Sequence, residues 1–441
     1  MTTQASSGHA ESPIKKFLRA TEIDSRMLGM VGAMLLIWVG FQIYGNLYND
    51  TALFGDSRAF ISAGNLWNLM VQSSSIAVMT CGMVLIIVMR HIDLSVGSIL
   101  GFVAVFVGVL QARILPGYIG LGHPMTWVIA LTVGICLGAM VGLLHGYLIA
   151  YLGIPSFIVT LGGLMFWRGA AYLLASGATV APLDATFVLL GGGPHGSVGY
   201  TFSWVLAALA CVLIVIGLVF DRKRRLNFKF ALRPRWAEML IGAVGCGVVI
   251  LTTWMVNVYY WAPGVVKQYL AANNKTMPPE GMQISTGYAI PVLIAVFVGI
   301  AMTFMATRTR FGRYIYATGG NPEAAELAGL NTRKITMMVF GLMGALCGIS
   351  ACIASARLQS ATNALGTSDE LSVIAAAVIG GVSLSGGAGT IYGAILGALV
   401  MQSLQSGMVL IGFDAAIQQM VVGGVLVAAV FIDTIYRKKS L

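Results

Sequence analysis

Long apolar stretches, separated by short polar intervals, run through most of the chain. Several reach roughly the 18–20 residues that a helix needs to cross a bilayer, which is typical of membrane spans rather than of strands or soluble helices. The pattern predicts spans at about residues 28–46, 66–89, 96–112, 126–150, 156–176, 202–220, 237–256, 288–306, 335–356, 390–411 and 415–434. A further apolar segment, 371–384, is too short for a full span, and we expect it to be re-entrant or a broken helix.

The predicted fold is all-α: a polytopic transmembrane helical bundle of about 10–12 spans that occupies 28–434. The positive-inside rule assigns segments rich in Lys and Arg to the cytoplasm. Four segments carry most of these residues: the tail 1–27, the loop 221–236, the loop 307–334 and the tail 435–441. Both termini are therefore expected in the cytoplasm, and the polar loop 257–287 is expected in the periplasm.

Composition excludes the soluble classes. The 441 residues are 58% hydrophobic and 10% charged, whereas a soluble domain has about 25% charged residues. The net charge of +10 does not indicate nucleic acid, because the basic residues gather at span ends, where topology explains them. All six cysteines fall inside apolar segments, and we interpret them as small packing residues rather than as metal ligands.

The loop 307–334 contains a short helix whose two ends can be read from the sequence. Asn321 suits the N-cap, Pro322 the first helical position, Glu323 the positive end of the helix dipole, and Gly329 the stop. So short a helix is not stable alone in water. We therefore expect it either to dock on a partner or to serve as an ordinary connector.

An internal repeat is a candidate feature, because two places share a pattern. In both, an apolar run ends in Leu-Ser and a glycine-rich helix follows, at Leu94-Ser95 and at Leu384-Ser385. Interrupted helices in transporters tend to lie near the substrate path, although so short a match also arises by chance. Asp93 adjoins the first turn, and it is expected either to cap the next helix through the amides of Ser95 and Gly97 or to act in gating.

Motifs for catalysis are missing from the sequence. It has no phosphate-binding loop of the Gly-x-x-x-x-Gly-Lys-Ser/Thr type, no Gly-x-Ser-x-Gly elbow and no His-Glu-x-x-His. We therefore expect a transport subunit, not an enzyme, that binds no cofactor or metal and hydrolyses no ATP itself. His145 lies mid-span and is interpreted as a packed, hydrogen-bonded histidine rather than as a proton relay.

Uncharged polar residues within or beside the spans suit a path for a neutral, hydroxylated solute, or they bond between helices. They are Asn68, Gln72, Ser73, Ser74, Ser75, Thr160, Asn363, Gln402, Gln405, Gln418 and Gln419. Arg168 lies near mid-span and is expected either to snorkel to the outer interface or to pair with an acid. The candidate path or gating residues are Asn68, Gln72, Ser74, Asp93, Ser95, Thr160, Arg168 and Asn363.

Four motifs resemble the permease subunits of bacterial ABC importers for monosaccharides, the ribose, xylose and galactose branch. They are IDLSVGS at 92–98, IPSFIVTLGG at 154–163 with WRG at 167–169, TRFGRYIYATGGNPEAAELAGLN at 309–331 and VIGGVSLSGGAGTIYGAILGA at 378–398. The PSFIVTL run and the basic insert look most like the xylose-type permeases. The loop 257–287 departs from that type by its greater length.

The resemblance implies a homodimeric permease of the bacterial inner membrane, in contact with lipid and not with nucleic acid. A periplasmic sugar-binding protein would deliver the monosaccharide, xylose or a related aldose. A cytoplasmic ATPase with two nucleotide-binding modules would bind ATP and Mg and drive import. The capped helix would be the coupling helix, with coupling residues Gly312, Arg313, Gly320, Asn321, Pro322, Glu323, Ala324, Ala325 and Gly329.

Two alternatives remain open at this point. The chain could be a stand-alone secondary carrier that uses Asp93 or Arg168 in ion coupling, although acidic residues within the predicted spans are few. The other alternative keeps the ABC permease but changes the solute, for example to a nucleoside.

Overall fold

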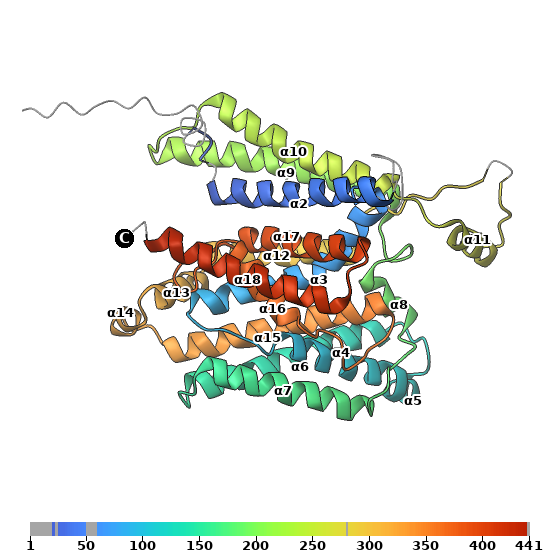
Figure 1. Ribbon diagram of the computed structural model, residues 1–441, viewed down its shortest axis with the longest axis horizontal. Coiled ribbons are helices and arrows are strands. Elements are labelled where there is room, and N and C mark those ends of the chain that lie inside the picture. The colour runs from blue at the N-terminus through green and yellow to red at the C-terminus, as the bar shows by residue number, and fades with distance from the viewer. Residues whose placement is uncertain (1–19, 23–24, 50–59, 279–280, 439–441) are drawn as a thin grey trace, which may run out of the picture.

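The computed structural model describes residues 20–22, 25–49, 60–278 and 281–438 (Figure 1). Within these ranges, ten helices are long and apolar enough to cross a membrane, which confirms the all-α polytopic bundle. The same ranges contain no β-strand, only three isolated β-bridges. Most of the predicted N-terminal tail and the end of the C-terminal tail lie outside the described residues, at 1–19, 23–24 and 439–441.

Most helices of the bundle lie side by side along one direction (Figure 1). The long ones are α2 (Ser25–Asn49), α3 (Ala63–Val88), α6 (Thr126–Ala150), α7 (Ser156–Ala175), α9 (Gly199–Asn227), α10 (Arg235–Val258), α12 (Ile290–Arg308), α15 (Thr332–Leu358), α17 (Ile391–Leu410) and α18 (Ala415–Lys438). The shorter ones are α4 (Val96–Val109), η1 (Leu110–Ile114), α5 (Pro116–Ile119), α8 (Ala185–Val188), η2 (Leu189–Gly191), α11 (Pro263–Ala272), α13 (Arg310–Gly320), α14 (Pro322–Leu327) and α16 (Asp369–Ile379).

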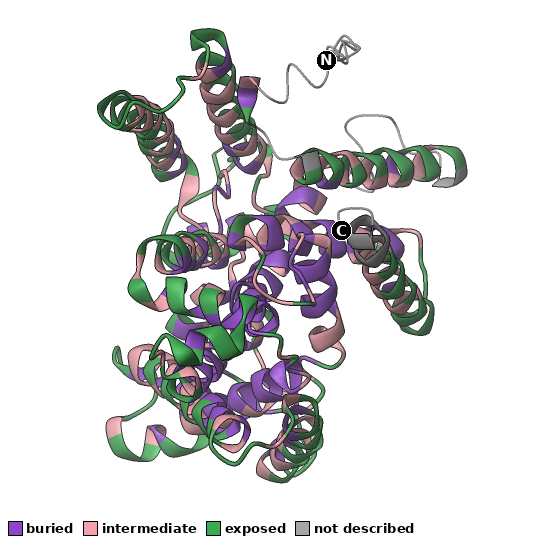
Figure 2. Cartoon of the chain, turned by 90° about the vertical axis from the view of Figure 1, so that its left-hand side faces the viewer, coloured by how far each residue is buried: buried purple, intermediate pink, exposed green. Residues whose placement is uncertain are grey.

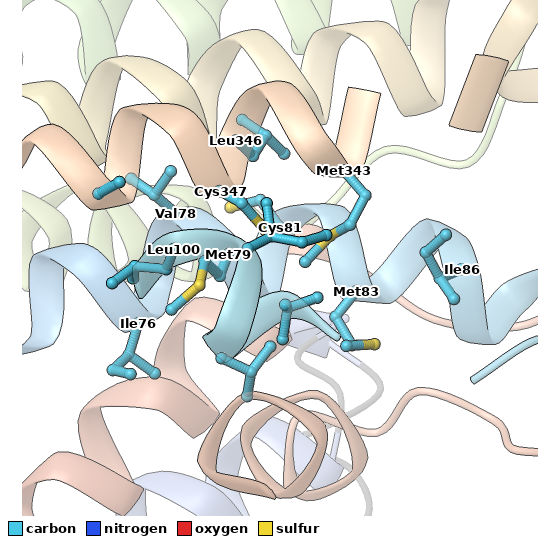
Figure 3. Packing of buried hydrophobic residues seen from close by; sticks show 14 of the residues in the cluster. Ile76, Val78, Met79, Cys81, Met83, Ile86, Leu100, Met343, Leu346 and Cys347 are labelled. Carbon is cyan, nitrogen blue, oxygen red and sulfur yellow. The ribbon is translucent and has the colours of Figure 1, made fainter. Parts of the chain in front are cut away.

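Helix α3 forms the centre of the bundle. Almost every residue from Leu66 to Val88 is buried, including the polar Ser73, Ser74 and Ser75, so other helices surround α3 on nearly all sides. Figure 3 shows Cys81 of α3 beside Met343, Leu346 and Cys347 of α15. Helix α3 therefore provides the packed core on which the other elements are placed.

Small residues bring α6 and α15 into the closest contact. Gly138 of α6 and Gly344 of α15 lie so near one another that neither has room for a Cβ against the carbonyl oxygen of the other. Such small-residue contacts replace the hydrophobic driving force that helices lack in lipid. They explain part of the use of glycine in this chain, which has 55 glycines.

Two short helices begin inside the bundle after a non-helical return. After α3 ends, the chain runs back toward the middle of the bundle, where α4 starts at Val96; after α15 it does so again before α16 (Figure 1). Helix α16 has 11 residues, which agrees with the short, broken element expected at 371–384. Parts of both returns are buried, with Asp93 and Ser95 in the first and Ala361 and Gly366 in the second, and non-helical backbone at membrane depth is tolerated where protein covers it or where it lines a cavity.

The two halves of the expected internal repeat lie in different local structures. Ser95 directly precedes the short helix α4 inside the bundle, but Leu384 and Ser385 lie in the turn that precedes the long helix α17. A long helix followed by a non-helical return and a short helix does occur twice, as α3–α4 and as α15–α16. The internal repeat itself stays a prediction.

The basic segments lie at one end of the bundle. The start of α2, the α9–α10 turn, α13–α14 and the end of α18 meet at the left of Figure 1, and α11 projects from the opposite end. Glu22 accepts hydrogen bonds from Arg225 and Arg233, which joins the tail to the basic loop. The two segments therefore share a side of the membrane, while the assignment of that side to the cytoplasm stays a prediction.

Three helices are packed more loosely than the rest. Helices α2, α9 and α10 stand apart from the buried centre, and most of their surface is exposed (Figure 2). Large apolar side chains on α9 and α10, among them Leu213, Phe220 and Leu251, are exposed. In a membrane protein such faces suit contact with lipid.

Candidate coupling segment and solute path

The candidate coupling segment, residues 307–334, contains two helices, α13 and α14. The sequence predicted only α14. Helix α13 follows α12 after a corner at Thr309, whose hydroxyl oxygen accepts a hydrogen bond from the Gly312 amide at 3.1 Å. Gly312 is buried against the carbonyls of α12 and has no room for a Cβ. Helix α13 was missed because it has no apolar stretch: only a narrow face, including Ile315 and Gly319, is buried.

The predicted capped helix is present as α14. The side-chain oxygen of Asn321 accepts a hydrogen bond from the Ala324 amide at 3.0 Å, and Pro322 occupies the first turn. Gly329 has a φ of +83°, the left-handed conformation that favours glycine after a helix. The caps read from the sequence are therefore those of the structure.

Helix α14 is attached to the bundle by one buried residue, and its other residues are exposed. Ala325 is 5% exposed, whereas Leu327 is 90% exposed. Glu323, Ala324, Arg313 and Gly320 are also exposed. Between α13, α14 and the start of α15 lies a cavity of about 360 Å³, lined by Phe311, Tyr314, Gly329, Leu330, Asn331, Lys334, Ile335 and Met338. An exposed leucine next to a cavity on a capped helix suits the docking of a partner.

A junction of three backbone segments connects the coupling segment to the interior. Arg90, just after α3, donates hydrogen bonds to the carbonyl oxygens of Gly319 (2.8 Å) and Gly320 (2.6 Å) at the end of α13. The Gly387 amide, in the turn before α17, donates to the Val88 carbonyl at 2.9 Å. The Tyr316 hydroxyl donates to the Gly389 carbonyl in the same turn at 2.7 Å. Movement of α13 would therefore act on α3 and on the α16–α17 turn together.

A buried polar chain holds the start of α4. One carboxylate oxygen of Asp93 accepts hydrogen bonds from the Ser95 amide (2.8 Å) and the Ser95 hydroxyl (2.5 Å). The Ser95 oxygen lies 3.3 Å from Nδ1 of His145, and the Trp167 indole donates to Nε2 of His145 at 3.0 Å. Because Nε2 accepts, His145 is neutral and its proton lies on Nδ1.

These bonds address the two roles that were open for Asp93. The Ser95 half of the predicted cap is present, while Asp93 makes no hydrogen bond to Gly97 among the described residues. His145 is a packed, hydrogen-bonded histidine, as expected. The arrangement joins α4, α6 and α7, and it indicates a structural role for Asp93.

Arg168 forms no ion pair within 4 Å among the described residues. Its Nη1 donates to the carbonyl oxygens of Asn363 (2.6 Å) and Leu365 (2.7 Å) in the return between α15 and α16. It also interacts electrostatically with Glu370 and Asp369. Arg168 therefore positions the second return, and it supplies donors to carbonyls that no regular helix satisfies.

A polar cavity of about 280 Å³ lies beside α3. Its walls come from α3, the end of α15, the return, the start of α16 and α17. Its polar lining residues are Gln72, Ser75, Arg357, Thr367, Asp369, Gln402 and Gln405. This volume is close to the lower limit of ligand clefts, about 300–1,000 Å³, which suits a small solute.

Of the eight candidate path or gating residues, the structure brings Gln72 to this cavity. Of the other polar residues that the sequence offered for a path, Ser75, Gln402 and Gln405 also line it. Asn68 is exposed one turn away on α3. The hydroxyls of Ser74 and Thr160 donate to carbonyls within their own helices, and Asn363 acts through its carbonyl. Arg357 and Asp369 were not among the predicted path residues, because their proximity arises from the non-helical return.

Metal-binding groups are not assembled in the part of the chain that the structure describes. No set of three or more His, Cys, Asp or Glu side chains there could hold a metal ion. Three of the six cysteines, Cys81, Cys347 and Cys352, are buried packing residues as expected, but Cys136 is exposed.

Comparisons with known proteins give the family. The chain is 32% identical over 381 residues to the xylose transport system permease protein of Haemophilus influenzae, covering 86% of this chain and 92% of the relative. It is 33% identical to the xylose transport system permease protein of Escherichia coli K12 (87% of this chain, 88% of the relative) and 29% identical to the ribose import permease protein of that strain (86% and 88%). No solved structure matches significantly.

The family profile described as the branched-chain amino acid transport system / permease component matches residues 65–430, which include the coupling segment, both returns and the polar cavity. Together with the ten candidate spans, these relatives identify a multi-pass protein of the inner membrane. The chain therefore belongs to the branched-chain amino acid transport system / permease component family, in which it is similar to the permeases of sugar import systems.

Proposed function

We propose that this chain is the permease subunit of an ATP-driven importer that translocates xylose or a related aldose across the inner membrane. In this proposal ATP and Mg are bound by a separate cytoplasmic ATPase with two nucleotide-binding modules. The permease forms a homodimer, and a periplasmic sugar-binding protein delivers the solute. The similarity to two xylose permeases over most of the chain supports the choice of sugar.

The observation that carries the proposal is the exposed, capped helix α14. Leu327 is 90% exposed, Glu323 is exposed beside it, and Ala325 attaches the helix to the bundle. When a partner covers so exposed a leucine, apolar surface leaves water and the complex is stabilised. The proposal assigns α14 to a groove on the ATPase, and the positive-inside rule supports the cytoplasmic position of this end.

The junction behind α14 supplies the path by which ATPase closure would act on the membrane region. Displacement of α13 pulls on Arg90 through the carbonyls of Gly319 and Gly320, and on the α16–α17 turn through Tyr316. Both connections lead to elements that begin inside the bundle, α4 and α16. Alternating access would then come from movements of these short helices against the packed core.

The test compares two exposed leucines at the same end of the bundle. Leu327→Asp is expected to lose the ATPase in a mild-detergent pull-down and to lose ATP-dependent xylose uptake. Leu232→Asp, which changes an exposed leucine in the α9–α10 turn, is expected to keep both. Membrane yield and gel-filtration profile show whether each variant inserts and folds. Retention of the ATPase and of uptake by Leu327→Asp would overturn the coupling role.

The secondary carrier has less support. Asp93 is held by Ser95 and lies in a chain with a neutral His145, and Arg168 is engaged by two carbonyls. A protonophore applied while cellular ATP is kept high separates the two functions. Uptake is expected to continue, and its prompt loss would favour the carrier.

A further inference from the structure

The polar cavity beside α3 carries an inference about the solute, which rests on the proposed function. We propose that this cavity is a contact site for one neutral, polyhydroxylated solute molecule within the transport path. Its amide, hydroxyl and charged groups recognise vicinal hydroxyls, and its aliphatic wall contacts the carbon–hydrogen face of the solute.

The amide groups supply the first part of the argument. Gln402 Nε2 donates to Gln72 Oε1 at 3.1 Å, and Gln405 Nε2 donates to the Ser372 hydroxyl at 3.1 Å. A primary amide offers two donor hydrogens and an oxygen with two lone pairs. Each of these amides is therefore held in position by one bond and keeps both donor and acceptor capacity, which matches a hydroxyl that also donates and accepts.

The lining of the cavity has no net formal charge. It contains one cation, Arg357, and one anion, Asp369, which lie on different helices. Because their formal charges cancel, the lining as a whole favours neither an anion nor a cation. A planar guanidinium and a carboxylate each bind two adjacent groups at once. Each of the two side chains thus suits two hydroxyls on neighbouring carbons of a neutral molecule.

The remaining wall of the cavity is apolar, and part of it belongs to the return between α15 and α16. Val71, Ile76, Ile353 and Leu365 contribute aliphatic surface, which suits the carbon–hydrogen face of a sugar ring. Leu365 and Thr367 belong to the return that Arg168 holds through the carbonyl of Leu365. A shift of this return would change the shape of the cavity, which provides a way to release the solute.

The test uses protection of an introduced thiol. Purified Gln405→Cys permease, in detergent and without ATPase or nucleotide, is treated with a water-soluble thiol reagent at increasing D-xylose concentration. D-xylose is expected to slow labelling, and D-xylonate, which has a similar carbon chain but carries a carboxylate, to slow it much less. Leu121→Cys, in an exposed loop, is expected to react at the same rate with or without sugar. The parent protein gives the background from its own cysteines.

Uptake provides the second measurement. Gln405→Leu is expected to raise the sugar concentration for half-maximal uptake by about tenfold, the equivalent of one net hydrogen bond. Gln268→Leu, an amide removed from the exposed surface of α11, is expected to leave it unchanged. Gln405→Asn keeps the amide and replaces Gln405→Leu if the latter fails to fold.

The two proposals fail separately. Absence of protection at Gln405→Cys together with unchanged half-maximal uptake in the Gln405 variant would overturn the cavity assignment and leave ATP coupling untouched. Protection that persists when uptake proves independent of ATP would leave the cavity assignment standing and overturn the ATP-driven importer. Equal protection by D-xylonate would overturn the preference for a neutral solute.

Discussion

Gly319, at the end of α13, lies directly against the carbonyl oxygen of Val88, at the end of α3, and no Cβ fits between them. Two hydrogen bonds hold the same contact: Arg90 donates to the Gly319 carbonyl, and the Gly387 amide donates to the Val88 carbonyl. The coupling segment and the core helix are therefore in backbone contact, without a flexible side chain between them. Such a contact transmits small displacements, because tightly packed atoms cannot be compressed.

Gly319→Ala is expected to disrupt this contact. The added methyl group forces α13 away from α3, at a cost typical of overpacking, about 1–3 kcal/mol. The unfolding temperature in detergent should fall. ATP-dependent uptake should fall by more than this loss of stability explains. Gly320→Ala is the matched control, since a Cβ on Gly320 meets nothing within 4 Å. Equal behaviour of the two variants would contradict the role of the contact.

Arg90→Lys tests the side-chain part of the same junction. The guanidinium reaches the carbonyls of Gly319 and Gly320 with two separate nitrogens, and an ammonium group cannot reproduce that fork. Each bond of this charged type contributes about 1.5–3 kcal/mol. The variant is expected to insert normally but to show reduced uptake and ATPase activity that no longer responds to sugar. Arg310→Lys, on an exposed position of α13, should behave as the parent protein.

The sequence carried enough information for the spans and for α14. Span lengths follow from apolar stretches, and the caps at Asn321 and Gly329 are local features of the backbone. Helix α13 and the end of α9 were missed for a common reason. Both are polar helices: α13 is stabilised by packing of Ile315, and α9 continues to Asn227 with the help of ion pairs between Asp221 and Arg225.

The cavity could not be predicted from the sequence. Gln72, Gln402 and Gln405 were recognisable as polar residues in spans, but their meeting depends on how α3 and α17 pack. Arg357 and Asp369 line the same cavity because of the return between them in the chain, which has no helical or strand periodicity. Long-range packing and non-helical backbone thus determine the site, whereas local patterns determine the helices.

The contact between the tail and the basic loop is expected to depend on pH. Hydrogen bonds from Arg225 and Arg233 lower the pKa of Glu22 from 4.5 to about 2. Since the folded-state pKa is the lower one, the stabilisation is complete above about pH 4.5 and is lost as the pH falls toward 2. The protection of amide hydrogens at residues 20–22, taken as the intrinsic exchange rate divided by the observed rate, should therefore fall over this range. Glu22→Gln should show low protection at every pH, while Glu326→Gln, an exposed control on α14, should leave the profile unchanged.

Arg168 is expected to set the position of the second return. Replacing it with Leu leaves the carbonyls of Asn363 and Leu365 without their donor, at a cost of about 1–3 kcal/mol for each buried group. Hydrogen exchange should quicken at 359–368, and uptake should fall with it, because Leu365 lines the cavity. Arg168→Lys keeps a donor for one carbonyl at a time. Its exchange rate and its uptake should lie between those of the parent protein and those of Arg168→Leu. Arg113→Leu, at an exposed position in η1, which follows α4, controls for the loss of a positive charge. If exchange at 359–368 stayed slow in Arg168→Leu, the return would be held by its own packing, and Arg168 would not position it.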